Sequence, residues 1–461
     1  MNQNNISAAE LFQRVRELLT LPDLEPKTRN KMMHDTLILC CHEGVKDTKQ
    51  AFGNLFSQVD YLCKAHGIKV ADKIAIQTMR RHSNSQEPLS GEDLKYDARA
   101  LTLFISAVFE ERIPHEVNVL IPHINRPFQK GLEINNRRIR CIVKNWDSDF
   151  IRVDIDQDAD EEEYLVRLKD EENHIDHTYL WDLLKEGMQL NLLDCQVKQP
   201  IITPRLIVVE PDYLVDISSI ATCFTAFGHH PLLYLLNLMK PRANTQATLL
   251  GNFAGAALDD IINSHGKYQV NETVKSNFRE KALEFCTCPW FDAKKFYTDA
   301  NLQAFNLQQV VDILFPRTAS QAKMSAFRGE SLYDRKKAIL EPSFVCEALG
   351  IQGRVDLMTT DCKLLVEQKS GRNMNIETHQ VDPAYHSYQL EPHYVQLLLY
   401  YGVLQHNFKL SNDRVNIRLL YSKYQPQDGL MVVAYYQKLF KEAIEYRNQL
   451  VAASFEIAKE G

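Results

Sequence analysis

The 461-residue chain lacks the sequence features that identify membrane proteins, secreted proteins and disulfide-rich proteins. It has no uninterrupted apolar run of about 18 residues, so no transmembrane helix is predicted. Its first residues, MNQNNISAAELF, lack the basic and apolar regions of a secretory signal peptide. Its ten cysteines are scattered without a disulfide framework, which is typical of buried thiols in a reducing compartment. We therefore expect a cytoplasmic protein with no membrane segment.

Other absences concern the chemistry. There is no excess of basic residues, because 53 lysines and arginines face 60 aspartates and glutamates, for a net charge of −7. A simple DNA-binding domain is usually basic. Part of the acidic excess is local, in the runs DIDQDADEEE and KDEEN, which leaves room for a basic channel elsewhere. There is no GxxxxGK[ST] loop, so the chain cannot hold ATP phosphates by that device.

The patterns that are present predict three regions in a mixed α+β chain. Residues 1–125 show the helical spacing of apolar residues. Residues 126–210 alternate between apolar and polar positions, most clearly at 150–155, which predicts a small, OB-like β-barrel. Residues 211–461 mix helical and strand patterns and predict an α/β domain.

Four aromatic residues of the predicted barrel could stack on the bases of a single strand. The alternative is that each of them belongs to the barrel core, which for any single aromatic is the more common situation. These residues are Trp146, Phe150, Tyr179 and Trp181.

The most informative stretch predicts a β-hairpin. Two apolar-rich runs, 353–358 and 363–369, flank a short polar break. A two-residue turn at 361–362 sets a register that places Asp356 opposite Glu367. Their Cβ atoms would then lie roughly 4.5–5.5 Å apart, which is destabilising unless a cation lies between the carboxylates.

A third polar residue belongs to the same face of this hairpin. Lys369 comes two residues after Glu367, so both side chains project from one side of the strand. Two carboxylates and an ammonium group make an arrangement suited to a hard divalent metal and a water molecule. The alternative is an edge hairpin whose charges are merely solvated.

The order of short motifs strengthens the functional interpretation. The segments GRVD, EQK followed by SGR, and QLLLY occur in this order within residues 353–400. They resemble the motifs of the RecB-like branch of the PD-(D/E)xK nucleases. The arrangement is most similar to the nuclease half of DNA replication ATP-dependent helicase/nucleases, the flap-processing type. The resemblance implies a restriction-endonuclease-type α/β core over 211–461.

The resemblance also implies an activity, a cofactor and partners. The activity is metal-dependent hydrolysis of DNA phosphodiester bonds with Mg²⁺ or Mn²⁺, on single-stranded or flap DNA in replication and repair. The partner implied besides DNA is a helicase motor. The motor would follow in a longer chain or be recruited as a separate protein, because the present sequence has no phosphate-binding loop.

Each candidate residue then has an expected role. Asp356 and Glu367 would bind the metal, Glu341 would complete the site through water, and Lys369 would orient the attacking water. Arg372 would hold a phosphate. Gln396 and Tyr400, at i and i+4 of one helix, would position the strand by a hydrogen bond and by stacking.

The sequence departs from the family pattern at two places. In the GxxxH motif of RecB-like nucleases the histidine is a metal ligand, and in the segment 251–255 a glycine, Gly255, stands in its place. We do not expect Asp259 or Asp260, one turn further on, to substitute for it. The flap-processing relatives hold an iron–sulfur cluster, but no cysteine follows Cys362, so no such cluster is predicted.

These departures leave two alternatives to a nuclease. The fold could serve as a catalytically weakened module that binds DNA or acts as a scaffold. The protein could instead be a small-molecule-binding or protein-interaction protein built on its N-terminal helices, without affinity for DNA.

Overall fold

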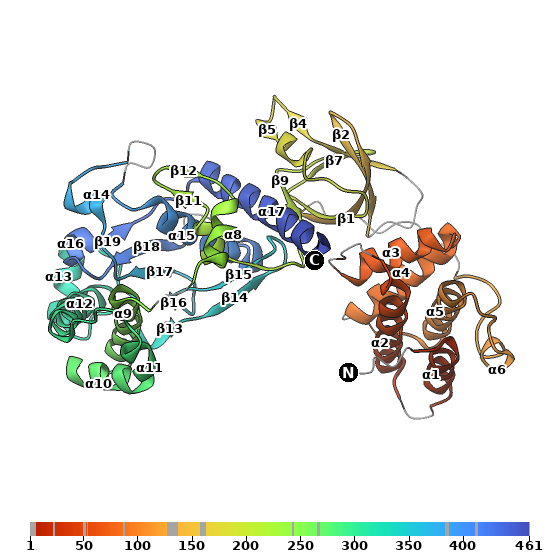
Figure 1. The fold of residues 1–461 in the computed structure, drawn as a ribbon, viewed down its shortest axis with the longest axis horizontal. Coiled ribbons are helices and arrows are strands. Elements are labelled where there is room, and N and C mark those ends of the chain that lie inside the picture. The colour runs from red at the N-terminus through yellow and green to blue at the C-terminus, as the bar shows by residue number, and fades with distance from the viewer. Residues whose placement is uncertain are drawn as a thin grey trace. The chain divides into compact units, whose positions relative to one another are not determined.

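The computed structural model describes residues 6–21, 24–48, 52, 54–85, 88–126, 137–156, 163–241, 244–264, 268–382, 387–410 and 414–460. The fold is mixed α+β, as predicted (Figure 1). It divides into two compact units, residues 1–213 with 451–461, and residues 214–450. The predicted regions 1–125 and 126–210 both fall in the first unit. No helix in the described part of the chain is long and apolar enough to cross a membrane.

The first unit begins with helices whose apolar faces form one core. Ser7 caps the first helix by accepting a hydrogen bond from the Glu10 N–H, and the Glu10 carboxylate accepts one from the Ser7 N–H at 2.8 Å. Cys40 and Cys41 are buried in this core. The helices are α1 (Ala8–Thr20), α2 (Pro26–Val45), α3 (Leu55–Ala65), α4 (Val70–Asn84), α5 (Gly91–Phe109) and α6 (His115–Asn118).

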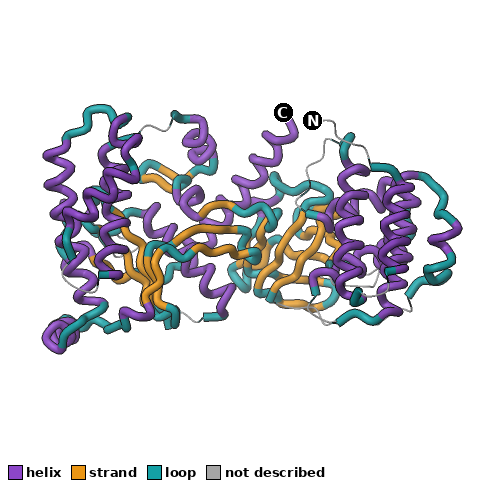
Figure 2. The backbone as a smooth tube through the Cα atoms, turned by 90° about the horizontal axis from the view of Figure 1, so that it is seen from below, coloured by secondary structure: helices purple, strands orange, loops and turns teal. Residues whose placement is uncertain are grey.

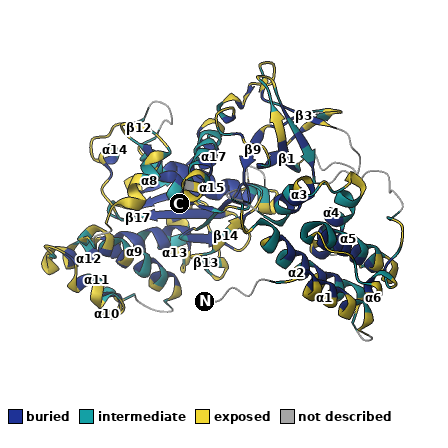
Figure 3. Ribbon diagram, turned by 45° about the vertical axis from the view of Figure 1, so that its right-hand side comes forward, coloured by how far each residue is buried: buried dark blue, intermediate teal, exposed yellow. Residues whose placement is uncertain are grey.

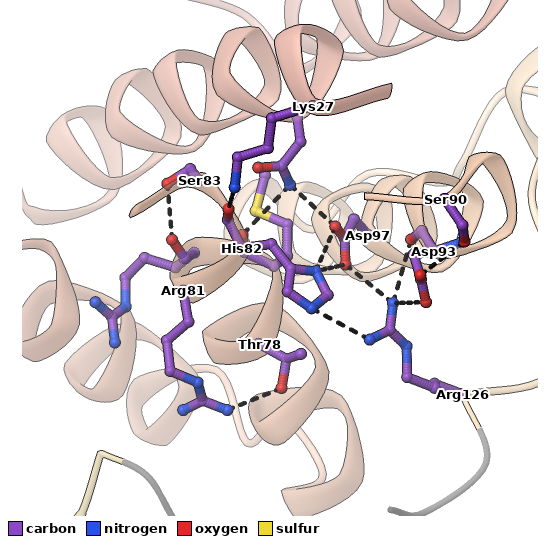
Figure 4. A network of polar contacts seen from close by, with 12 residues as sticks. Lys27, Thr78, Arg81, His82, Ser83, Ser90, Asp93, Asp97 and Arg126 are labelled. Atoms are coloured by element: carbon purple, nitrogen blue, oxygen red, sulfur yellow. Dashed lines mark hydrogen bonds and ion pairs between the residues drawn. The ribbon is translucent and has the colours of Figure 1, made fainter. Parts of the chain in front are cut away.

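A buried carboxylate fastens these helices together (Figure 4). Asp97 of α5 accepts a hydrogen bond from Asn30 of α2 at 2.9 Å and lies 2.8 Å from Nδ1 of His82 in α4. The other ring nitrogen of His82 lies 3.3 Å from the Arg126 guanidinium. Because Asp97 is buried, these partners are what make its charge tolerable.

The second part of the first unit is a seven-stranded sheet in the order β7-β8-β3-β2-β1-β6-β9. The pairing is antiparallel except between β3 and β8. No pair joins the edge strands β7 and β9 among the described residues, so the OB-like barrel stays a prediction. The strands are β1 (Arg138–Trp146), β2 (Phe150–Ile155), β3 (Tyr164–Arg167), β6 (Gln189–Leu193), β7 (Gln196–Lys198), β8 (Ile201–Thr203) and β9 (Leu206–Val209).

Smaller elements accompany this sheet. A two-stranded ribbon, β4 (Lys169–Asp170) with β5 (Ile175–Asp176), precedes a short 3₁₀ turn at Thr178–Leu180. Of the four aromatic residues considered for base stacking, Trp181 is exposed and the others are half-buried. The acidic run at 157–162 lies outside the described residues.

Charged pairs join the helices and the sheet within this unit. Arg80 of α4 forms an ion pair with Asp156 at 2.5 Å, and Arg81 donates to the Asp156 carbonyl at 2.6 Å. Lys73 of the same helix lies 3.2 Å from Asp154 of β2. The helical region and the sheet therefore share contacts as parts of one unit.

The second unit is built on two sheets. A five-stranded sheet has the order β13-β16-β17-β18-β19, with β17 and β18 parallel and the other neighbours antiparallel. A three-stranded sheet has the order β10-β15-β14. The strands are β10 (Val215–Asp216), β13 (Ala338–Leu340), β14 (Ser343–Cys346), β15 (Ile351–Arg354), β16 (Leu357–Thr359), β17 (Leu364–Lys369), β18 (Asn416–Tyr421) and β19 (Leu430–Val432).

Helices cover both faces of the five-stranded sheet (Figure 2). Leu364 and Val366 of β17 belong to the core formed with α9 and α12, and α15 packs against β17 and β18 on the other side. Strand β17 is therefore buried along most of its length, although only its first three residues, Leu364, Leu365 and Val366, are apolar (Figure 3). The long helices are α9 (Gln246–Asn263), α12 (Ala293–Leu314), α15 (Glu391–Phe408) and α17 (Gln437–Glu460).

Shorter elements complete the second unit. Helix α8 is apolar, yet none of its residues is buried. These elements are α7 (Ile217–Ala221), β11 (Phe224–Thr225), β12 (Gly228–His229), α8 (Leu232–Met239), α10 (Val270–Glu280), α11 (Ala282–Cys286), α13 (Ala319–Phe327), α14 (Met374–Glu377) and α16 (Pro426–Gly429), with a 3₁₀ turn at Arg335–Lys337.

Candidate active site

The predicted hairpin exists as β16 and β17, and its register is confirmed. Leu357 pairs with Val366 and Met358 with Leu365, so the next positions outward are Asp356 and Glu367. The two-residue turn predicted at 361–362 is wrong, because β16 ends at Thr359 and β17 begins at Leu364.

The turn is longer because a side chain closes it. The Thr359 hydroxyl accepts hydrogen bonds from the N–H groups of Lys363 and Leu364, both at 3.1 Å. Cys362 takes the left-handed conformation, with φ of 55°. The longer turn preserves the register, so the facing carboxylates survive the error in the turn.

Asp356 lies at the break between two sheets. Strand β15 ends at Arg354 and β16 begins at Leu357, so the chain leaves one sheet and enters the other around Asp356. Its carboxylate accepts a hydrogen bond from the Gln368 N–H at 2.5 Å. Burial raises the pKa of Asp356, and the negative charge of nearby Glu341 adds to the effect.

Glu367 is the most deeply buried acid of the site, with 2% of its surface exposed. One carboxylate oxygen, Oε1, accepts a hydrogen bond from Lys369 at 2.7 Å. The other oxygen, Oε2, is buried and has no hydrogen-bond partner. Burial and the charge of Asp356 together raise the pKa of Glu367 to about 8.

The structure brings Lys369 and Gln396 to the same place, while the predicted role of Gln396 in positioning a DNA strand stays a prediction. The Lys369 ammonium lies 2.7 Å from Glu367 and 2.9 Å from the Gln396 side-chain oxygen. Gln396 comes from α15, which crosses this face of the sheet. The ammonium group is therefore held between a strand residue and a helix residue.

Tyr400 has a different role from the one predicted. It is buried, and its hydroxyl donates a hydrogen bond to the Arg354 carbonyl at 2.6 Å. A Cβ atom on Gly353 would lie 3.0 Å from the Tyr400 ring. The ring therefore has no free face for a base, and the stacking prediction is wrong. The close contact explains why the GRVD segment begins with glycine.

Glu341 lies at the rim of the site, one residue beyond the end of β13. It has a left-handed backbone, with φ of 48°, and its N–H donates to the Asp356 carbonyl at 3.0 Å. Its carboxylate forms an ion pair with Arg354 at 3.1 Å. Glu341 is thus close to Asp356, but it follows the adjacent strand rather than belonging to it.

Asp259 on α9 is a further acidic residue that interacts with the site. Burial raises its pKa to about 7, and the charges of Glu341 and Asp356 contribute to this increase. A Cβ atom added at Gly255, one turn earlier on the helix, would meet no atom within 4 Å. The expectation that Asp259 does not replace the missing histidine as a metal ligand stays a prediction.

A signal for Asp259 was present in the sequence. Residues Gly251, Gly255 and Asp259 follow one another at intervals of four, so they share one face of the helix. Counting four residues from Gly255 instead of from Gly251 leads to a carboxylate, that of Asp259. The neighbouring Asp260 is engaged elsewhere, in a hydrogen bond from Thr273.

Arg372 follows the end of β17 and forms an ion pair with Glu377. Its side chain is 62% exposed, so the guanidinium remains accessible from solvent. The predicted contact with a phosphate stays a prediction.

The donor set fits a hard divalent cation. Asp356 and Glu367 supply carboxylate oxygens, which Mg²⁺ and Mn²⁺ prefer, and the unpartnered Oε2 of Glu367 is a vacant acceptor within the site. Among the described residues no three His, Cys, Asp or Glu side chains gather closely enough to hold a metal ion by themselves. Further ligands would be the backbone carbonyl near Gln368 and water.

Comparisons with known proteins do not add to this description. No protein-family model matches the chain, and no curated protein is found to be similar to it. Function is therefore argued from the side chains of the site and their chemistry.

Proposed function

We propose that the protein is a metal-dependent nuclease that hydrolyses phosphodiester bonds of DNA. The observation that carries the proposal is the pair of half-buried Asp356 and buried Glu367, with an unpartnered oxygen on Glu367 and the Lys369 ammonium alongside. Two neighbouring carboxylates shielded from water destabilise each other unless a cation joins them. Such costs are concentrated at functional sites.

The residues of the hairpin would divide the chemistry between them. Asp356 and Glu367 would hold Mg²⁺ or Mn²⁺, with Glu341 reaching the ion through water. When bound, the ion lowers the pKa of a water molecule and stabilises the charge that develops on the phosphate. Lys369, kept in place by Gln396, would donate a hydrogen bond to the attacking water or to a phosphate oxygen.

Asp259 extends this site toward proton transfer. With a pKa of about 7, its carboxyl group gains or loses a proton near neutral pH. Its charge interacts with those of Asp356 and Glu341, so it would accept a proton from water on the α9 side of the site.

The substrate would be a single strand or a flap, as the family resemblance implies. Gly251 and Gly255 lie on the helix face that leads to Asp259, and a side chain at Gly255 would point into open space. A strand could approach the hairpin beside Gly255, whereas the face at Gly251 is occupied by the Ser370 hydroxyl, 3.2 Å from an added Cβ atom. A helicase motor, in the same chain or in a separate protein, would supply such strands.

The first test is Asp356→Asn, which keeps the size of the side chain and removes its charge. Cleavage of a labelled single-stranded oligonucleotide with Mn²⁺ is expected to fall by at least roughly 10²–10³-fold. Asp361→Asn is the matched control, because Asp361 lies in the turn of the same hairpin and pairs with Lys337 at 3.1 Å. Equal cleavage by the Asp356 variant and the wild type would refute the proposal.

A binding or scaffolding module is the second candidate. The observation that favours it is the lack of a third converging ligand among the described side chains. This candidate predicts DNA binding without cleavage in either Mg²⁺ or Mn²⁺, and unchanged affinity when Asp356 is replaced.

A further inference from the structure

The site has a positively charged neighbour at the end of the two central strands. Strands β17 and β18 are parallel, with Lys369 paired to Tyr421, and the Ser422 N–H donates to the Lys369 carbonyl at 2.9 Å. Both strands therefore terminate at the same end of the sheet. Arg372 comes three residues after Lys369, at most roughly 10 Å of extended chain, and Lys423 comes two residues after Tyr421, the neighbour of Lys369 in β18.

Three donors from these two segments converge on one carboxylate, that of Glu377. Arg372 forms an ion pair with it, the Lys423 ammonium lies 3.2 Å away, and the Tyr424 hydroxyl donates to it at 2.9 Å. The hydroxyl oxygen of Tyr424 also accepts a hydrogen bond from the Asn373 N–H at 2.7 Å. Hydrogen bonds from Arg372, Tyr424 and Lys423 lower the pKa of Glu377 to about 2, so Glu377 is an anion at neutral pH.

This donor set is the kind that recognises a phosphate. A guanidinium, an ammonium group and a hydroxyl can all donate to phosphate oxygens, and a DNA phosphodiester carries the same single charge as the carboxylate. Exposed ion pairs contribute little to stability. One anion can therefore replace the other at low cost.

We propose that Arg372, Lys423 and Tyr424 form a binding site for a phosphate of the DNA strand, and that Glu377 occupies this site in the free protein. The inference rests on the proposed function, since it takes the ligand to be the strand that reaches Asp356 and Glu367. The strand has to displace the Glu377 carboxylate, so Glu377 lowers the affinity for DNA. No donor has to move when the phosphate binds, because Arg372, Lys423 and Tyr424 already surround an anion.

The experiment measures binding without cleavage. Fluorescence anisotropy of a labelled single-stranded oligonucleotide in EDTA gives the dissociation constant. Glu377→Gln keeps the shape and the hydrogen bond with Tyr424 but removes the competing charge, so we expect binding to tighten roughly 2–5-fold. Arg372→Ala with Lys423→Ala should weaken binding and reduce its salt dependence.

Two controls isolate the subsite. Glu272→Gln removes the same charge from α10, where Glu272 pairs with Lys275 at 2.8 Å, and should leave affinity unchanged. Glu377→Gln should also have no effect when Arg372 and Lys423 are both alanine. Equal tightening by Glu272→Gln, tightening that persists without the two cations, or no tightening at all would each overturn the inference.

The outcome is separable from that of the nuclease proposal. If Glu377→Gln tightens DNA binding but the protein never cleaves DNA, the phosphate subsite is supported and the nuclease function is contradicted. If the protein cleaves DNA but Glu377→Gln does not change its affinity, the nuclease function is supported and the phosphate subsite is contradicted. A wild-type protein without affinity for the oligonucleotide contradicts both.

Discussion

At the scale of single residues, burial opposes the negative charge of the acidic side chains in the site. The pKa of Glu367 is about 8 in the folded protein, against 4.5 for a free glutamate. Between these two pH values the folded state holds more protons than the unfolded state. The free energy of unfolding therefore falls as pH rises from about 4.5 to about 8. A divalent cation that binds the ionised pair would offset this loss.

Glu367→Gln should consequently stabilise the metal-free protein at high pH. In EDTA at pH 8.5 we expect the variant to be more stable than the wild type by roughly 1–3 kcal/mol, the cost of an unsatisfied buried group. At pH 5 the difference should shrink, because Glu367 is then protonated in the folded protein. Urea denaturation at the two pH values measures both quantities.

Glu272→Gln serves as the control for this comparison, since the side chain is 67% exposed and should change little at either pH. A Glu367→Gln variant that is less stable than the wild type at pH 8.5 would mean that the ionised carboxylate is well compensated. The argument for a missing cation between Asp356 and Glu367 would then be lost.

The sequence was informative about residues whose direction follows from strand alternation. Asp356, Glu367 and Lys369 were found because a two-residue period fixes which side each one faces. The burial of Tyr400 was not predicted because it depends on packing between helix and sheet. Nothing local to α15 says that the Tyr400 ring is covered by Gly353 and bonded to Arg354.

At the scale of elements, α9 has open space beside one of its glycines, Gly255, whereas other glycines of the chain are closely packed. A Cβ atom at Gly255 would meet nothing within 4 Å, whereas one at Gly402 of α15 would lie 2.4 Å from the Phe440 ring. Gly402 is thus required by packing against α17, and Gly255 is not. We infer that Gly255 serves access to the site and not the fold.

This contrast gives a prediction for two alanine substitutions. Gly255→Ala should stabilise the protein by about 0.5–1 kcal/mol, because alanine favours the helix and its methyl group has room. Gly402→Ala should destabilise it by about 1–3 kcal/mol through overpacking. Thermal or urea denaturation measures both. Destabilisation by Gly255→Ala would show that the space beside α9 is filled in the native protein.

The order of elements could largely be predicted, and their ends less so. The alternating segment at 150–155 forms a strand with these bounds, as β2. The hairpin turn is longer than predicted because the Thr359 hydroxyl closes it. Side-chain closure of a turn does not appear in a pattern of apolar residues.

At the scale of the whole molecule, the acidic charge is unevenly divided. Residues 214–450 contain 25 lysines and arginines and 23 aspartates and glutamates, a net charge of +2. The remaining residues therefore carry a net charge of −9, which together with +2 gives the total of −7. The overall acidity, which argued against nucleic acid at first, belongs to the first unit. The second unit, which holds the candidate site, has no such excess.

This division predicts where DNA contacts the chain. Hydrogen–deuterium exchange of the Asp356→Asn variant with a single-stranded oligonucleotide and Mg²⁺ keeps the strand intact during the measurement. Protection is expected around 251–259, 367–377 and 421–424, the segments that carry the glycine face, the hairpin end and the phosphate subsite. The helices of residues 8–118 should exchange as they do without DNA, because this region has 15 lysines and arginines against 16 aspartates and glutamates and so no basic excess to attract phosphates. Protection confined to the seven-stranded sheet around Trp181 would instead make that sheet the main DNA-binding surface, and the second unit would lose its role in holding the strand.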